Sequence, residues 1–264
     1  MEPATLAELR VLFAFLFYLG FVALARPAEL RVRRAELPFL ALFGILGLGG
    51  VQLAYYEAID RLPIGVALVI EYTAPLMILG FWRLRGRPVG GRLWLAGALT
   101  LAGCWFVVGA YDAGLRELNA LGAAIALFDA VLLALYFLLA ERLTKRSSAW
   151  TVLLWGFGFA LLAWSVRRPV WDLPWGAQSG AVWLLVLGVV VVGTVVPYLL
   201  SIAAVRYISG ARVGLTSTIE PVIAALAAWS LLAERLEPLQ VAGGVVVLAG
   251  IVVAQSQRPS GGSV

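Results

Sequence analysis

The chain of 264 residues has no histidine, one cysteine (Cys104) and one lysine (Lys145). A single cysteine excludes a disulfide within the chain. Of the usual zinc ligands, histidine is absent and cysteine occurs once, so we expect no metal and no cofactor. Acyl and phosphoryl transfer need a histidine, an activated nucleophile with its base, or an acidic metal cluster. The composition therefore argues against an enzyme, and no nucleotide-binding G-x-x-x-x-G-K-[ST] sequence occurs.

Charge is also scarce: 13% of the residues are charged and 62% are hydrophobic. A soluble globular chain is about 25% charged. The apolar residues extend over the whole length, which excludes a soluble domain with one membrane anchor. Runs such as 184–200 do not alternate apolar and polar residues, as the strands of a β-barrel would. The composition predicts an all-α polytopic membrane protein.

Nine long apolar segments are present, and a helix needs about 20 apolar residues to cross the hydrocarbon core. Most of the segments reach that length. We expect nine spanning helices, at 6–25, 36–58, 63–83, 92–110, 119–140, 150–166, 179–205, 211–233 and 238–255.

The basic residues indicate an orientation, because Lys and Arg accumulate in short cytoplasmic loops. Alternate connections hold 14 of the 20 Lys and Arg residues, and the other side holds 6. This bias predicts a cytoplasmic C-terminus in a multi-pass protein of the bacterial plasma membrane. The net charge of +5 is explained by this placement, so we expect no nucleic acid partner.

Three carboxylates lie within the apolar segments: Glu71, Asp129 and Glu220. An ionisable group at bilayer depth costs roughly 2.5–3.5 kcal/mol on insertion scales. We therefore expect them to face an internal cavity. For Asp129 the alternative is that a neighbouring tyrosine satisfies it.

Five segments each carry one polar stripe at helical spacing. Lipid does not solvate such stripes, so they are expected to face one another and line the cavity. The alternative is that the hydroxyls of Ser, Thr and Tyr merely form hydrogen bonds between helices, at about 0.6 kcal/mol on average. The predicted lining residues are Gln52, Tyr55, Tyr56, Tyr72, Thr73, Tyr136, Thr194, Tyr198, Ser201 and Ser217.

Residues 53–97 resemble residues 199–243, and the paired prolines Pro75 and Pro221 are 146 positions apart. The odd number of intervening helices gives the two copies opposite orientations, as in the inverted repeats of secondary transporters. Pro75, Pro197 and Pro221 lie mid-segment, where each removes a backbone hydrogen bond. They are expected to break their helices, either as moving parts or as static kinks.

The second copy, IEPVIAALAAWSLLAERLEPLQVAGGVVVLAG, and the first, EYTAPLMILGFWRLRGRPVGGRLWLAG, resemble the two EamA domains of the drug/metabolite transporter superfamily. The first copy departs from the pattern at Pro88, where the second copy has Glu234. The resemblance implies ten helices in two inverted five-helix repeats around a substrate cavity. We expect a first repeat at 1–110 that lacks its first helix, a second at 119–256, and a cytoplasmic tail at 257–264.

The first copy is similar to the branch of bacterial exporters for threonine, homoserine and similar metabolites. The resemblance implies a secondary transporter that moves a small polar metabolite such as an amino acid outward by alternating access. A membrane carboxylate is the natural proton carrier, Glu71 first and Glu220 second. The expected partners are a small-molecule substrate and the lipid bilayer, with the chain a monomer or homodimer. The alternatives are a membrane-embedded enzyme and an uncoupled channel.

Overall fold

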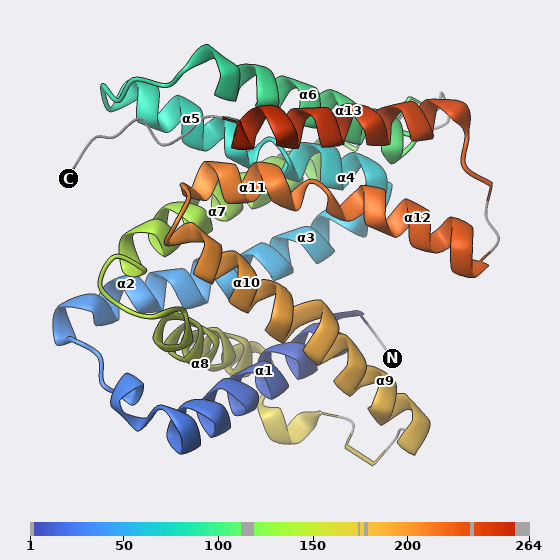
Figure 1. Ribbon diagram of the computed structural model, residues 1–264. Coiled ribbons are helices and arrows are strands. Elements are labelled where there is room, and N and C mark those ends of the chain that lie inside the picture. Colours follow the sequence, from blue (N-terminus) through green and yellow to red (C-terminus); the bar gives the residue numbers. More distant parts are fainter. Residues whose placement is uncertain (1–2, 112–118, 174, 177–178, 233–234, 257–264) are drawn as a thin grey trace. The chain divides into compact units, whose positions relative to one another are not determined.

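Figure 1 shows the computed structural model, which describes residues 3–111, 119–173, 175–176, 179–232 and 235–256. Helices make up the regular structure of these residues, and they contain no strand. Eight helical stretches of the described chain are long and apolar enough to cross a membrane, and Gly91–Val107 is a shorter apolar helix. The predicted all-α membrane fold is confirmed. Glu234 and the predicted tail at 257–264 lie outside the described residues.

Several of the expected spans are divided into shorter helices. The first part of the chain forms α1 (Pro3–Ala25), η1 (Pro27–Leu30), η2 (Arg34–Glu36), α2 (Leu37–Leu42), η3 (Phe43–Gly50), α3 (Val51–Ile59), α4 (Ile64–Glu71), α5 (Ala74–Leu84) and α6 (Gly91–Val107). The second part forms α7 (Ala120–Leu143), α8 (Ala149–Arg167), η5 (Val170–Asp172), α9 (Gly180–Val190), η6 (Val191–Val195), α10 (Val196–Val205), α11 (Gly210–Ser217), α12 (Glu220–Leu232) and α13 (Pro238–Gln255).

Two glycines with positive φ follow the ends of α5 and α6 in the first copy. Gly86 has φ 74° just after α5, and Gly109 has φ 69° just after α6. After Gly109, the N–H of Ala110 donates to the carbonyl of Trp105 at 3.0 Å. This left-handed cap suits glycine, which has no Cβ to clash. It explains why α6 ends at Val107 and not at residue 110, as expected from the apolar run.

Two π-helical segments, η3 (Phe43–Gly50) and η6 (Val191–Val195), interrupt the spans Arg34–Ile59 and Gly180–Val205, one in each sequence copy. The offset of 146 residues that relates the copies places η6 on residues 45–49, inside η3. Neither segment was expected from the sequence. π-Helical turns are rare and concentrate at functional sites, so their recurrence at equivalent positions marks a feature that the two copies share.

The chain forms two compact units, and each unit takes helices from both sequence copies. Unit 1 consists of Met1–Tyr56 and Leu135–Tyr207, and unit 2 consists of Glu57–Ala134 and Ile208–Val264. Neither unit coincides with one sequence copy, because the first copy divides between the units after Tyr56, and the second copy divides after Ala134, within α7, and again after Tyr207.

In unit 2, α6 and α13 lie side by side along much of their length (Figure 1). A Cβ at Gly103 would lie 2.8 Å from the carbonyl oxygen of Gly243, and a Cβ at Gly250 would lie 2.7 Å from Cγ2 of Thr100. The contacts run in opposite directions along the two sequences, so the helices are antiparallel. Glycines let the backbones approach this closely.

In unit 1, α1 packs against α8 in the same antiparallel sense. Arg168 near the end of α8 donates to Thr5 at the start of α1. At the other end of the pair, Phe21 stacks on Trp150 with centroids 4.2 Å apart. The 146-residue offset relates α1 to α8 and α6 to α13. Antiparallel packing of equivalent helices is what an inverted repeat produces.

Candidate functional site

Two spans of unit 2 break next to the carboxylates that the sequence singled out. α4 ends at Glu71 and α5 begins at Ala74, while α11 ends at Ser217 and α12 begins at Glu220. The 146-residue offset relates the two breaks residue by residue. Figure 1 shows the second break between α11 and α12.

The paired prolines explain where the helices break. Pro75 and Pro221 have no N–H, so the carbonyls of Glu71 and Ser217 lose their usual helical donors four residues later. Both proline rings are buried in unit 2. The residues within the breaks supply local substitutes, because the hydroxyls of Thr73 and Thr218 each donate to a backbone carbonyl three residues earlier, at 2.6 Å. The helices are therefore interrupted at Pro75 and Pro221, as predicted.

The three carboxylates all belong to unit 2. The side chain of Glu71 interacts electrostatically with both Asp129 and Glu220. Asp129 lies on α7 and is 1% exposed. Its Oδ1 has no hydrogen-bond partner among the described residues. The structure thus brings Asp129, from α7, together with Glu71 at the end of α4.

The two glutamates occupy unequal electrical positions. Glu71 is the last residue of α4, where the negative end of the helix dipole disfavours a second negative charge. Glu220 is the first residue of α12, where the dipole favours it. A cation or a proton in this cluster would therefore be stabilised most by Glu71.

Of the polar neighbours in unit 2, two hydroxyls satisfy themselves locally. Thr73 bonds to Ile70, and Ser217 donates to the carbonyl of Val213 at 3.1 Å. Tyr72 is buried in an apolar cluster with Cys104, whose thiol faces the carbonyl of Thr218 at 3.9 Å. The hydroxyls of Thr73 and Ser217 therefore bond to the preceding turn of their own span, and these bonds do not run between helices as the alternative to a cavity required.

The other predicted lining residues belong to unit 1. The ring of Tyr198 makes edge contacts with Tyr136 and Phe157, at centroid distances of 6.2 and 5.5 Å. Gln52 is buried, and neither of its amide atoms has a hydrogen-bond partner within the described chain. The rings of Tyr55 and Tyr56 lie 5.9 Å apart.

Ser201 is half-buried and lies on α10. Pro197 is exposed and occupies the first turn of α10, directly after η6. A proline here is tolerated because the first turn of a helix does not use its N–H. The predicted interruption at Pro197 therefore takes the form of a π-helical segment ahead of the proline.

Two residues of α1 that the sequence did not single out hold η6. Nε of Arg10 donates to the hydroxyl of Thr194 at 2.8 Å, and Nη2 donates to the carbonyl of Gly193 at 3.1 Å. The hydroxyl of buried Tyr18 donates to the carbonyl of Val195 at 2.7 Å. In the sequence, Arg10 is one of the six basic residues of the less basic side, and no other role is predicted for it. Its spacing of eight from Tyr18 places both side chains on one helix face.

These observations define a helical, multi-span membrane protein with an inverted internal repeat and three interacting carboxylates, of which Asp129 is buried, Glu71 half-buried and Glu220 exposed. The chain belongs to the EamA-like transporter family, whose profile matches residues 1–109 and 120–255. It is therefore a membrane transporter of the multi-pass inner-membrane type, which points away from an enzyme.

Curated relatives agree with this family. The chain is 28% identical over 257 residues to an uncharacterized transporter of Archaeoglobus fulgidus, covering 96% of this chain and 87% of the relative. It is 28% identical over 237 residues to the threonine/homoserine exporter RhtA of Escherichia coli K12, covering 87% of this chain and 75% of that protein.

A solved crystal structure has the same fold, with a TM-score of 0.80 at 20% identity. The match covers 97% of this chain and 88% of the other.

Proposed function

We propose that the protein exports a small polar metabolite such as an amino acid, by alternating access coupled to protons through Glu71. The observation that carries this proposal is the electrostatic interaction of Glu71 with Asp129 and Glu220 beside paired helix breaks. The Escherichia coli relative is named a threonine/homoserine exporter, which supports an amino acid as the substrate class.

The cluster suggests how an amino acid and a proton could be exchanged. The negative charges of interacting carboxylates repel one another, and one positive charge among them relieves that repulsion. The ammonium group of an amino acid and a proton each supply one positive charge. Because they compete for the same carboxylates, binding of the proton favours release of the amino acid, as an exporter driven by inward proton movement requires.

The two breaks suggest which parts could rearrange. Discontinuous helices recur at the substrate sites of transporters built from inverted repeats, where irregular backbone can line a cavity. We place the repeats at 1–110 and 119–256, with the C-terminus in the cytoplasm. The polar residues of unit 1, Gln52, Thr194, Tyr198 and Ser201 among them, stay in the proposal as lining of the transport pathway.

Counterflow of radiolabelled amino acids in proteoliposomes tests this function. Vesicles loaded with one candidate amino acid are expected to accumulate its labelled form transiently, and an imposed pH gradient is expected to drive net flux. Glu71→Gln keeps size and polarity but removes the charge, so it is expected to abolish the gradient-driven flux. Unchanged flux in this variant would remove Glu71 from the mechanism.

Glu57→Gln is the matched control. Glu57 pairs with Arg61 at 2.8 Å near the end of α3, with its side chain 39% exposed, and it takes no part in the carboxylate cluster. It is expected to transport at the wild-type rate. A steady current that neither saturates nor shows counterflow would indicate a channel and overturn the proposal of a carrier.

A further inference from the structure

Unit 1 carries an apolar groove of about 320 Å³ that lies outside the transport site. Phe15 and Leu19 of α1 form one wall, and α8 forms the other from Leu154 to Leu162. Leu30 of η1 closes one end. All of its lining residues are apolar, so the groove would not hold a polar metabolite.

The length of the groove matches one leaflet of a bilayer. From Leu154 to Leu162, α8 rises about 12 Å at 1.5 Å per residue. Half of the hydrocarbon core is about 15 Å. At the Leu30 end, the indole N–H of Trp155 donates to the carbonyl of Leu30 at 3.3 Å. Leu30 belongs to the connection between the spans Thr5–Ala25 and Arg34–Ile59, and tryptophan is typical of the membrane interface. This end of the groove therefore faces the headgroups, and the rest extends along the acyl chains.

Three arginines follow Leu30 directly. Arg31, Arg33 and Arg34 are exposed, and none forms an ion pair with any residue that the structure describes. Arg26, by contrast, pairs with Glu29 at 3.0 Å and lies over the ring of Trp150. The interface end of the groove therefore presents guanidinium groups that are available to an external anion.

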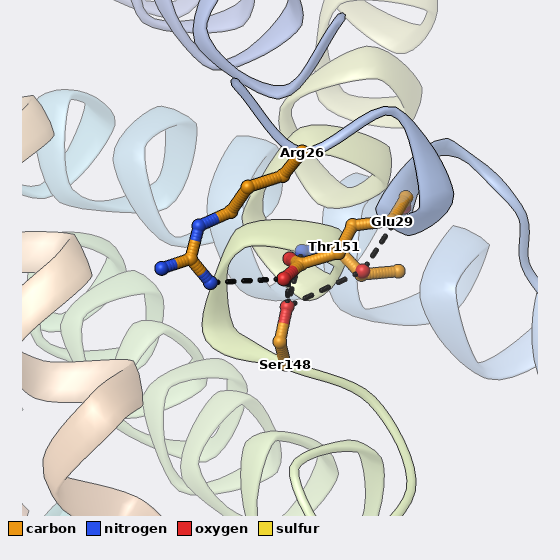
Figure 2. Close-up of polar contacts among 4 residues, drawn as sticks. All are labelled: Arg26, Glu29, Ser148 and Thr151. Carbon is orange, nitrogen blue, oxygen red and sulfur yellow. Dashed lines mark hydrogen bonds and ion pairs between the residues drawn. The ribbon is translucent and has the colours of Figure 1, made fainter.

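The acidic residues of the same connection are turned toward α8, as Figure 2 shows for Glu29. One carboxylate oxygen of Glu29 accepts from Arg26 and the other accepts from Ser148, while its backbone carbonyl accepts from Thr151 at 3.0 Å. Glu36 is buried and accepts a hydrogen bond from Ser147 at 2.8 Å. Both carboxylates thus have partners within the protein, and the outward face of residues 31–34 is basic.

We propose that this groove binds one anionic phospholipid, with an acyl chain along α1 and α8 and the phosphate on Arg31, Arg33 and Arg34. The apolar length, the interfacial tryptophan and the unpaired arginines select a molecule that is an anion at one end and a hydrocarbon at the other. Juxtamembrane arginines attract anionic lipids strongly enough to distinguish them from zwitterionic ones. The groove shares no residue with the transport pathway proposed above.

Native mass spectrometry of the purified, delipidated protein tests the site. The protein is offered phosphatidylglycerol and phosphatidylcholine with the same acyl chains, and the retained lipids are counted. We expect one phosphatidylglycerol to be retained with roughly ten-fold or greater preference. Phosphatidylglycerol with a photoactivatable acyl chain is expected to crosslink to residues 15–19 and 154–162.

Two variants separate the headgroup from the chain. Arg31→Gln combined with Arg33→Gln and Arg34→Gln is expected to remove the preference for phosphatidylglycerol. Its control replaces Arg83, Arg85 and Arg87, basic residues at the end of α5 in unit 2, with Gln. Leu162→Trp fills the mouth of the groove and is expected to abolish the crosslink, whereas Val166→Trp, on the same helix but outside the groove, keeps it.

Equal retention of the two lipids by the wild-type protein would overturn the proposal, as would a preference that survives the triple arginine replacement. Crosslinks outside α1 and α8 would also overturn it. A lipid-free dimer protected at residues 154–162 would show that a second copy, and not a lipid, covers the groove. Because the crosslinking uses the wild-type chain, a variant that fails to fold leaves the site testable.

Discussion

Arg10 and Thr194 are 184 positions apart in the sequence, yet their side chains are joined by a hydrogen bond of 2.8 Å within unit 1. The bond ties α1 to the π-helical segment η6 of the span Gly180–Val205. The guanidinium forms no ion pair with any described residue. A charge within a membrane span that lacks a counter-ion is costly, so such residues usually have a function.

Arg10→Gln is expected to release η6 and to lower both stability and transport rate. Hydrogen bonds from charged groups contribute about 1.5–3 kcal/mol each, and partial exposure of Arg10 places the cost at the low end. Equilibrium unfolding in detergent and the initial rate of flux measure the two effects. Arg167→Gln, an exposed arginine at the end of α8, is the control. If both variants unfold alike, η6 does not depend on Arg10.

Gly243→Ala is expected to destabilise the protein, whereas Gly244→Ala next to it is not. A Cβ at Gly243 would lie 2.6 Å from Cβ of Phe106 and 2.8 Å from the carbonyl of Gly103. At Gly244 the nearest atom is Cγ1 of Val222 at 3.5 Å, an ordinary contact. Overpacking costs about 1–3 kcal/mol, while alanine in an open helical position gains about 1 kcal/mol over glycine. In unfolding titrations, the changes in unfolding free energy relative to the wild type should have opposite signs in the two variants. Equal midpoints would contradict the close packing of α6 on α13.

Ser148→Ala is expected to cost about 1 kcal/mol or more, because Ser148 caps α8. Its hydroxyl oxygen accepts from the N–H of Thr151 at 3.2 Å and its hydroxyl donates to Glu29. Ser179 also precedes a helix, α9, but its side chain makes no capping bond, so Ser179→Ala is the control. A double-mutant cycle with Glu29→Gln should show a coupling energy. Additive effects would mean that the contact in Figure 2 contributes nothing to stability.

Asp129→Asn and Glu8→Gln are expected to change stability in opposite directions. Asp129 carries a buried carboxylate oxygen without a partner in the described chain, and its charge interacts with that of Glu71. Neutralising it is expected to stabilise the fold by about 1–3 kcal/mol while reducing transport. The carboxylate of Glu8 faces Arg168 at 4.0 Å, so neutralising it removes this ion pair, while Arg168 keeps its hydrogen bond to Thr5. Thermal unfolding at neutral pH shows whether each variant gains or loses stability. Destabilisation by Asp129→Asn would show that this carboxylate has a structural partner.

The spans could be predicted from composition because the requirement for about 20 apolar residues is local. The helix breaks at Pro75 and Pro221 could also be predicted, since the missing N–H is a property of one residue. The π-helical segments could not, because their sequences, such as VVGTV in η6, are those of ordinary apolar helices. The role of Arg10 was missed for a related reason: its partner lies in a span far along the sequence.

The apolar segments, the repeat with its offset of 146 residues and the three carboxylates can all be read from the amino-acid sequence alone. The packing of the helices adds that each compact unit draws helices from both copies, and that Asp129 joins the glutamates in unit 2. Apolarity and proline chemistry act within a single helix. The partners of a buried charge depend instead on which helices pack together, and many packings of equally apolar helices satisfy the same hydrophobic pattern.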